Sequence, residues 1–303
     1  MNLLVTGANG QVGTELRALQ DIALQNNISM YFLSRNELNL SQASCEQWLN
    51  LLNKKEIDAV INCAAYTKVD LAETEREEAF RVNHWAVEQL AKACEQTGST
   101  LIQISTDFVF DGSHNTPYKE NAPTCPLGCY GQSKLAGEEA ALTYCSRSLI
   151  VRTAWVYSSY GHNFVKTMLR LAATRPQLNV VYDQIGSPTY AADLAQALLT
   201  IAITQNSIVG ADDKKNEVWQ QQIYHYANEG VCSWYDLAYN TLQLSHFDCI
   251  IRPIETTDYP TPARRPAYSV LHTEKIRRDF GLTIPYWRDS LQRCLQQLKA
   301  QTP

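Results

Sequence analysis

The chain has 303 residues, of which 45% are apolar and 19% are charged, and its formal net charge is −5. This composition supplies a sizeable core and predicts one large domain, or a medium domain with a smaller appendage. The acidic balance argues against nucleic acid or an anionic membrane as the main partner. The nine cysteines show no paired metal-type spacing, and no apolar run approaches the roughly 20 residues that span a bilayer. We therefore expect free thiols and a cytoplasmic location.

The amino-terminal residues predict a strand, a glycine-rich turn and a helix. Residues 2–6 form a short apolar run, and residues 12–23 place apolar side chains near helical spacing. Between them, Gly7 permits a tight turn, Gly10 lets the backbone approach a pyrophosphate, and Gly13 lets the helix pack on the strand. The helix N-terminus adds free N–H groups for the phosphates. An ordinary strand–helix turn is the alternative, but we favour a dinucleotide site that comprises Gly7, Asn9, Gly10, Gln11, Val12 and Gly13.

Two further strands supply candidate cofactor contacts. Residues 28–33 predict the second strand, and Arg35 follows it where this layout places the adenosine ribose. Arg35 suits a 2′-phosphate, which predicts NADPH with NADH also accepted; a neutral surface arginine is the alternative. Residues 58–65 predict a third strand, and its small end would let a cofactor lie against Ala64, Ala65 and the adjacent Tyr66.

Helices are predicted over residues 42–53 and 75–96, and a fourth strand over residues 99–105. Thr106 and Asp107 follow that strand directly. A hydroxyl and a carboxylate at the carboxyl end of a central strand lie where open α/β sheets bind ligands. Local turn chemistry is the alternative for both residues, but we favour a functional role.

Tyr130 and Lys134 form the strongest chemical candidate. Their spacing of four places both side chains on one face of a predicted helix. A free phenol has a pKa of about 10, and a nearby ammonium would lower it and give an acid–base group near neutral pH. The pair alone is weak, because exposed helices often carry it by chance. It gains weight from the glycine-rich turn upstream.

The remaining pattern predicts an α/β fold with a doubly wound, parallel sheet of the Rossmann type. A fifth strand is expected at residues 149–153, helices at 163–172, 191–203, 273–279 and 286–299, and a strand at 223–227; residues 204–221 are polar, and 252–266 extended. We therefore expect a Rossmann domain over residues 1–155. Residues 156–303 would form mainly a substrate-binding lobe, with elements interleaved back into the first domain.

These landmarks resemble the extended short-chain dehydrogenase/reductase superfamily and, within it, the dTDP-4-dehydrorhamnose reductase family. The likeness covers nearly the whole chain. Its motifs occur in the family's order as TGANGQVG, NCAAYTKVD, STDFVFDG, YGQSKLAGE, RTAWVY, NFVKTMLRLA, DQIGSPT, IYHYAN, CSWYDLA and PTPARRPAYSVL.

The resemblance implies that NAD(P)H reduces the 4-keto group of a dTDP-linked 4-keto-6-deoxyhexose, in a monomer or weak homodimer. It places the superfamily's catalytic set on Thr106, Tyr130 and Lys134. A planar guanidinium suits phosphate oxygens, so Arg265, with Lys166 or Arg264, is our candidate for holding the diphosphate. The other expected substrate contacts are Asp107, Asn163 and Trp155. A surface position for the arginines and a core position for Trp155 are the alternatives.

Two departures from the family pattern stand out. Tyr268 occupies a position where the family usually has asparagine, and Asn39 stands where an acidic residue is common. Some members link dimers through a metal held by a glutamate; Ala192 stands near that place, so we expect no metal.

Two rival functions remain open at this point. Another nucleotide-sugar reductase or epimerase of the same fold would keep the Tyr–Lys pair, and an epimerase would show no net oxidation of added NAD(P)H. A regulatory subunit resembling that of methionine adenosyltransferase would keep the fold as a binding module. An intact catalytic set favours an enzyme.

Overall fold

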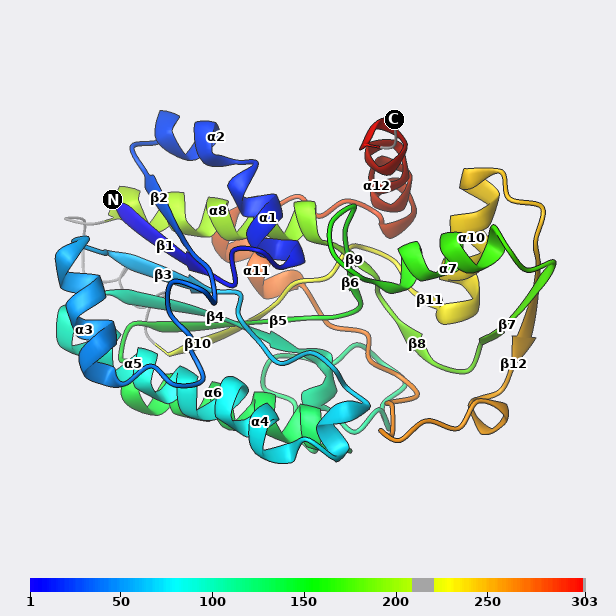
Figure 1. Cartoon of the computed structure of the whole chain (residues 1–303), viewed down its shortest axis with the longest axis horizontal. Helices are drawn as coiled ribbons and strands as arrows, with labels where there is room; N and C mark the ends of the chain where they lie inside the picture. The colour runs from blue at the N-terminus through cyan, green and yellow to red at the C-terminus, as the bar shows by residue number, and fades with distance from the viewer. Residues whose placement is uncertain (209–220, 302–303) are drawn as a thin grey trace.

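The centre of the computed structural model, which describes residues 1–208 and 221–301, is a six-stranded parallel sheet (Figure 1). Its strand order is β10-β5-β4-β3-β1-β2. The strands are β1 (Asn2–Thr6), β2 (Ser29–Leu33), β3 (Ala59–Asn62), β4 (Thr100–Thr106), β5 (Ser148–Thr153) and β10 (Gln222–His225). The expected α/β class with a parallel, doubly wound sheet is confirmed.

The strand order reverses beside β1. The chain passes from β1 to its neighbour β2 and then crosses to β3 on the other side of β1, so that Leu4 pairs with both Tyr31 and Val60. In open α/β sheets, ligands bind outside the carboxyl ends of the strands at such a reversal. The topology therefore predicts a ligand site at the loops after β1 and β3.

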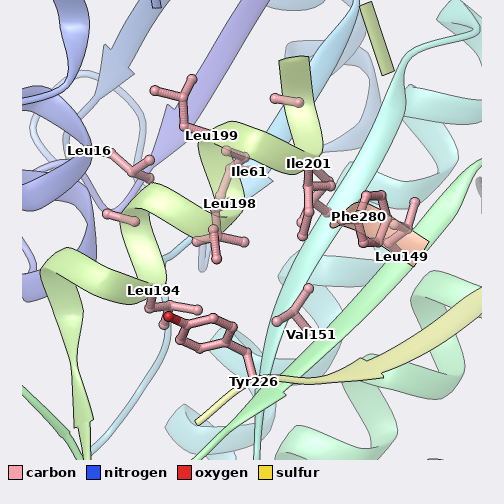
Figure 2. Close-up of a cluster of buried hydrophobic side chains, with 14 of the residues drawn as sticks. Leu16, Ile61, Leu149, Val151, Leu194, Leu198, Leu199, Ile201, Tyr226 and Phe280 are labelled. Carbon is pink, nitrogen blue, oxygen red and sulfur yellow. The ribbon is translucent and has the colours of Figure 1, made fainter. Parts of the chain in front are cut away.

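Helices cover both faces of the sheet (Figure 1). One face carries α1 (Gln11–Arg17), α2 (Gln20–Gln25), α8 (Ala191–Ile208) and α11 (Glu274–Phe280). The other carries α3 (Cys45–Lys54), α5 (Ala86–Thr97) and α6 (Cys129–Tyr144). Successive strand residues point to opposite faces, so Leu3 and Val5 join the α8 core while Leu4 joins the α5 core. Figure 2 shows Leu194 and Leu198 of α8 within the first of these clusters.

A smaller lobe lies beyond the carboxyl ends of the sheet strands (Figure 1). Its elements are β6 (Val156–Tyr157), α7 (Phe164–Ala172), β7 (Gln177–Val181), β8 (Ile185–Gly186), β9 (Thr189–Tyr190), β11 (Cys232–Ser233), α10 (Trp234–Ser245), β12 (Ile250–Ile254) and α12 (Trp287–Gln301). Short strand pairs, such as β7 with β12, brace it. The late strand β10 returns to the main sheet beside β5. The domain boundary at residue 155 stays a prediction.

Several expected elements differ in detail. The helix expected over residues 75–96 is divided into α4 (Arg76–Phe80), a π-helical turn η2 (Arg81–Trp85) and α5. The sequence did not indicate this division, because one π turn barely disturbs the apolar periodicity. The first periodic stretch is split into α1 and α2, and β7 was not predicted. Helix α8 continues to Ile208, so the polar stretch expected from residue 204 begins as helix; its residues 209–220 lie outside the described ranges.

Short 3₁₀ turns complete the fold at η1 (Leu71–Glu73), η3 (Asp107–Val109) and η5 (Thr256–Asp258). None of the described helices combines the length and apolar character needed to cross a bilayer.

Candidate active site

The glycine-rich turn joins β1 to α1, and its glycines serve different ends. Gly7 has a φ of +63°, and a Cβ there would lie 2.7 Å from the Ala64 nitrogen. A Cβ on Gly13 would lie 2.4 Å from the Gly7 carbonyl oxygen. Both glycines are therefore required by the fold itself. A Cβ on Gly10 would meet only the Gly7 oxygen, at 3.2 Å, so this position is open toward a ligand.

A cleft opens at the strand reversal beside this turn. Residues from the loops after β1, β2 and β3 line it, including Gly7, Gly10, Arg35, Asn39, Cys63, Ala64, Ala65 and Tyr66. Asn9 is exposed on the turn, and the Gln11 side chain accepts a hydrogen bond from Asn163 at 3.0 Å. The small side chains and the open Gly10 backbone fit the pyrophosphate and ribose portions of a dinucleotide.

Arg35 lines the cleft and has an acidic neighbour that the sequence did not reveal. Its side chain is 76% exposed, and its guanidinium lies 4.0 Å from the Glu78 carboxylate of α4. An ion pair this exposed is weak. Arg35 is therefore available to an anion, with Glu78 as a competitor for it.

Thr106, Tyr130 and Lys134 come together where β4 ends and α6 begins. Thr106 and Tyr130 share a hydrogen bond, and the Phe108 ring packs edge-on against Tyr130 with centroids 5.5 Å apart. Gly131 permits this approach, because a Cβ there would lie 2.3 Å from the Phe108 carbonyl oxygen. The Lys134 ammonium donates a hydrogen bond of 2.8 Å to the Ile104 carbonyl oxygen. The geometry thus unites the predicted catalytic set.

The acidity of Tyr130 differs from the expectation. Burial raises its pKa to about 12, opposed by the hydrogen bond with Thr106 and reinforced by the charge of Asp107. Burial also lowers the pKa of Lys134 to about 8, against the pull of Glu138. The phenol pKa is therefore not lowered as predicted, because desolvation dominates it and the charge that acts on Tyr130 is that of Asp107 rather than that of Lys134.

Asp107 lies at the start of η3 and is 1% exposed. Thr106 donates a hydrogen bond of 3.1 Å to its Oδ1 atom. Burial raises the pKa of Asp107 to about 6, although hydroxyls of Ser269 and Thr106 oppose the shift. A carboxyl group beside the phenol is thus poised between its neutral and charged forms.

Asn83, in the π turn η2, is a site residue that the sequence reasoning missed. Its Oδ1 accepts from the Tyr66 backbone nitrogen at 2.8 Å, and its Nδ2 donates to the Tyr66 oxygen and to Ser133 Oγ, both at 3.0 Å. It therefore links the cleft wall to helix α6, one residue before Lys134. The feature that distinguishes Asn83 is the π turn that interrupts the helix, and the spacing of apolar residues in the sequence does not reveal that turn.

Arg265 and the other basic candidates have different hydrogen-bond partners. It donates hydrogen bonds to the Asp70 carboxylate at 2.8 Å and to the Ala263 carbonyl oxygen at 3.2 Å. Arg264 is exposed, and the Lys166 ammonium donates to the Ser159 oxygen at 3.0 Å. Asp70 pulls Arg265 onto the loop after β3, across 195 residues of sequence. The expectation that Arg265 holds a diphosphate with Lys166 or Arg264 stays a prediction.

Trp155 and Asn163 both hold the smaller lobe together. Trp155 has a φ of +49° and stacks on Trp234 with ring centroids 3.6 Å apart and an interplanar angle of 6°. Asn163 caps α7, accepting from the Lys166 nitrogen at 3.0 Å. Tyr268 bridges to Ile185 of β8. Substrate contacts of Trp155 and Asn163 stay predictions.

Within residues 1–208 and 221–301, no cluster of three or more His, Cys, Asp or Glu side chains is arranged to hold a metal ion. The position noted above for a metal-binding glutamate is Ala192.

The reversal-point cleft and the Thr106–Tyr130–Lys134 set define an oxidoreductase of the extended short-chain dehydrogenase/reductase class. The model of one family, described as the RmlD substrate binding domain, matches residues 1–300, and the chain belongs to this family. It is similar to a dTDP-4-dehydrorhamnose reductase of Sinorhizobium fredii, with 40% identity over 98% of each chain. The expected family is thereby confirmed.

Solved structures agree. A dTDP-4-dehydrorhamnose reductase from Clostridium acetobutylicum is 34% identical, with a TM-score of 0.87, and the match covers 99% of this chain and 100% of that one. The Bacillus anthracis reductase, solved in complex with NADP, is 33% identical with a TM-score of 0.87, over 98% and 99% of the two chains.

Proposed function

We propose that the protein reduces the 4-keto group of dTDP-4-dehydro-L-rhamnose to give dTDP-L-rhamnose, with a nicotinamide cofactor in the cleft beside Gly7 and Gly10. Membership of the family and the names of its relatives support the substrate. The observation that carries the chemistry is the convergence of Thr106, Tyr130 and Lys134 beside a cleft that fits a dinucleotide.

The reduced nicotinamide supplies a hydride to the C4 carbon of the sugar. As negative charge develops on the carbonyl oxygen, Tyr130 donates its proton to that oxygen. Thr106, by turning its hydroxyl from Asp107 Oδ1 to the carbonyl oxygen, would donate a second hydrogen bond, an interaction that strengthens as the charge grows. Lys134 provides a positive charge one helical turn from Tyr130 and donors for ribose hydroxyls.

The raised pKa of Tyr130 is compatible with this direction of reaction. At a pKa of about 12 the phenol is fully protonated near neutral pH and is ready to donate. An alkoxide is a stronger base than a phenolate, so the transfer is downhill. A donor in reduction does not need the lowered pKa that a base in oxidation would need.

The test compares Tyr130→Phe with Tyr144→Phe, an exposed tyrosine at the far end of the same helix. Turnover is followed as the loss of NADPH absorbance on adding the 4-keto sugar nucleotide. Tyr130→Phe should bind cofactor normally and lose on the order of 10²-fold in kcat, while Tyr144→Phe stays near wild type. Near-normal turnover of Tyr130→Phe would refute the assignment.

Substrate identity is tested in the same assay with dTDP-4-keto-6-deoxyglucose, the epimer, as control. NADPH consumption with the L-rhamno substrate alone supports the proposal. Equal consumption with both would indicate a broader nucleotide-sugar reductase. No consumption with either would favour a binding module of the same fold.

NADPH is the preferred cofactor in this proposal, and NADH is accepted. Arg35 offers a cation at the cleft, and the nearby Glu78 carboxylate tempers the preference for a 2′-phosphate. KM values for both cofactors, measured in wild type, Arg35→Ala and Glu78→Gln, decide the point. The ratio of the NADH to the NADPH KM should fall in the first variant and rise in the second. An unchanged ratio in Arg35→Ala would make Arg35 a surface charge only.

A further inference from the structure

Helix α6 carries a third ionisable residue in line with the catalytic pair. Tyr130, Lys134 and Glu138 follow one another at intervals of four, which places them in one column along the helix face. Lys134 and Glu138 are both buried, with exposed fractions of 4% and 1%. Glu138 therefore lies one turn behind Lys134, away from Tyr130.

Arg152 fixes the Glu138 carboxylate in place. The Arg152 Nε atom lies 2.9 Å from Glu138 Oε1 and 3.1 Å from Oε2, and Nη2 lies 2.7 Å from Oε2. Arg152 is on β5, paired in register with Ser105, the residue before Thr106. This bidentate contact has ideal geometry for a buried ion pair, so the carboxylate is held rigidly between the central sheet and α6.

The charges of this cluster do not balance without Glu138. Lys134 and Arg152 are both cations, and Glu138 is the carboxylate whose charge acts on Lys134 within the described ranges. Arginine does not lose its proton in proteins. If the Glu138 charge were removed, the buried excess of positive charge would be relieved by deprotonation of Lys134.

The other ionisable groups nearby do not replace Glu138. Burial and the Arg152 charge lower the pKa of His225, on β10, to about 3, so this imidazole is neutral. Burial raises the pKa of the Cys63 thiol, at the end of β3, and keeps it neutral. Asp107 acts on Tyr130. On α11, Lys275 donates to the Ile223 oxygen at 2.8 Å, and the charge of Glu120 acts on Lys275.

We propose that Glu138 is a positioning residue for the reaction: its carboxylate, oriented by Arg152, keeps Lys134 protonated one helical turn from Tyr130. The proposal rests on the proposed function, because it assigns a task to the Lys134 charge. Glu138 touches neither substrate nor cofactor in this role and acts through Lys134.

The test begins with the pH profile of kcat/KM for Glu138→Gln. Loss of the carboxylate should move the alkaline limb, set by deprotonation of Lys134, to lower pH by one unit or more. A one-unit shift from a pKa of about 8 reduces activity about fivefold at pH 8 and about twofold at pH 7. Glu138→Asp, which keeps the charge, should retain most of the wild-type limb, and Glu139→Gln, an exposed neighbour, should leave the profile unchanged.

A purely structural role predicts a different result. Glu138→Gln would then lose activity by the same factor at every pH, and Glu138→Gln/Arg152→Gln would be worse still. The electrostatic role predicts that this double variant moves the limb back toward wild type, because one positive and one negative charge have both been removed. Thermal melting and cofactor titration identify any variant that does not fold.

A direct titration separates this proposal from the proposed function. The ¹³Cε signal of Lys134 in protein labelled with ¹³C-lysine, assigned by its loss in Lys134→Arg, reports protonation whether or not the enzyme turns over. The midpoint should fall in Glu138→Gln and stay near the wild-type value in Glu138→Asp. An unchanged midpoint in Glu138→Gln overturns the inference, even if the reductase assignment holds.

Discussion

Replacement of Asp107 by asparagine should make the protein more stable at alkaline pH. The side chain is 1% exposed, and burial raises its pKa to about 6 from an ordinary value of 3.8. The folded state therefore binds a proton more tightly than the unfolded state does. Its stabilising contribution is fully present below about pH 4 and is lost as the pH rises through about 6.

A difference of about 2 pKa units corresponds to about 3 kcal/mol when the carboxylate is fully ionised in both states. Asparagine has the same shape and never ionises, and its amide oxygen can still accept from Thr106. We expect Asp107→Asn to raise the free energy of unfolding at pH 8 by about 1 to 3 kcal/mol. The gain should be about 1 kcal/mol larger at pH 8 than at pH 5.

Urea denaturation at pH 5 and pH 8 measures this difference and cancels effects that do not depend on pH. Asp111→Asn is the matched control. Hydrogen bonds from the Ser113 backbone and side chain and from Tyr118 lower the pKa of Asp111, so it is ionised in both states throughout this range. Its effect should be the same at both pH values. A gain for Asp107→Asn that is constant, or larger at pH 5, would refute the reasoning.

Three further predictions follow from described contacts. Gly13→Ala would place a Cβ 2.4 Å from a carbonyl oxygen of its own turn and should lower the free energy of unfolding by about 1 to 3 kcal/mol, whereas Gly10→Ala should melt near wild type yet bind cofactor poorly. Asp70→Asn should barely change the melting temperature, because the partly exposed ion pair between Asp70 and Arg265 contributes about 0 to 1 kcal/mol. The substitution should lower KM for the sugar nucleotide by releasing Arg265, and an unchanged KM would contradict this. Burial lowers the pKa of His225 to about 3, so its contribution to wild-type stability is complete above about pH 6.5 and is lost as the pH falls toward 3. In urea denaturation, the free energy of unfolding of His225→Gln should therefore fall less between pH 6.5 and pH 5 than that of the wild type.

The parts of the site that depend on local sequence could be predicted. The turn at Gly7 and the helix that carries Tyr130 follow from short-range patterns, and the structure contains both. The parallel, doubly wound class of the sheet followed from the alternation of strands and helices, whereas its strand order was not predicted. The turn and the helix need only neighbouring residues to specify them, and the sheet class needs only the succession of elements along the chain.

The contacts that depend on distant residues could not. Asp70 reaches Arg265 across 195 residues, and no local signal pairs them. The strands β7 and β12 gain their structure from each other. The π turn at Asn83 is hidden because its one-residue irregularity leaves the apolar pattern almost intact.

The error over Tyr130 has a general cause. Spacing shows which charge is near a group, but desolvation depends on every atom around it. Tyr130, Lys134 and Asp107 are all shifted by burial toward their neutral forms. Such a site disfavours charged side chains in the resting enzyme. Its low dielectric also strengthens any hydrogen bond to a charge that develops during the reaction. In the proposed mechanism, hydride addition creates one negative charge on the carbonyl oxygen, beside the hydroxyls of Thr106 and Tyr130. The same burial that disfavours a resting phenolate therefore increases the stabilisation available when that oxygen becomes charged, until the phenol proton neutralises it.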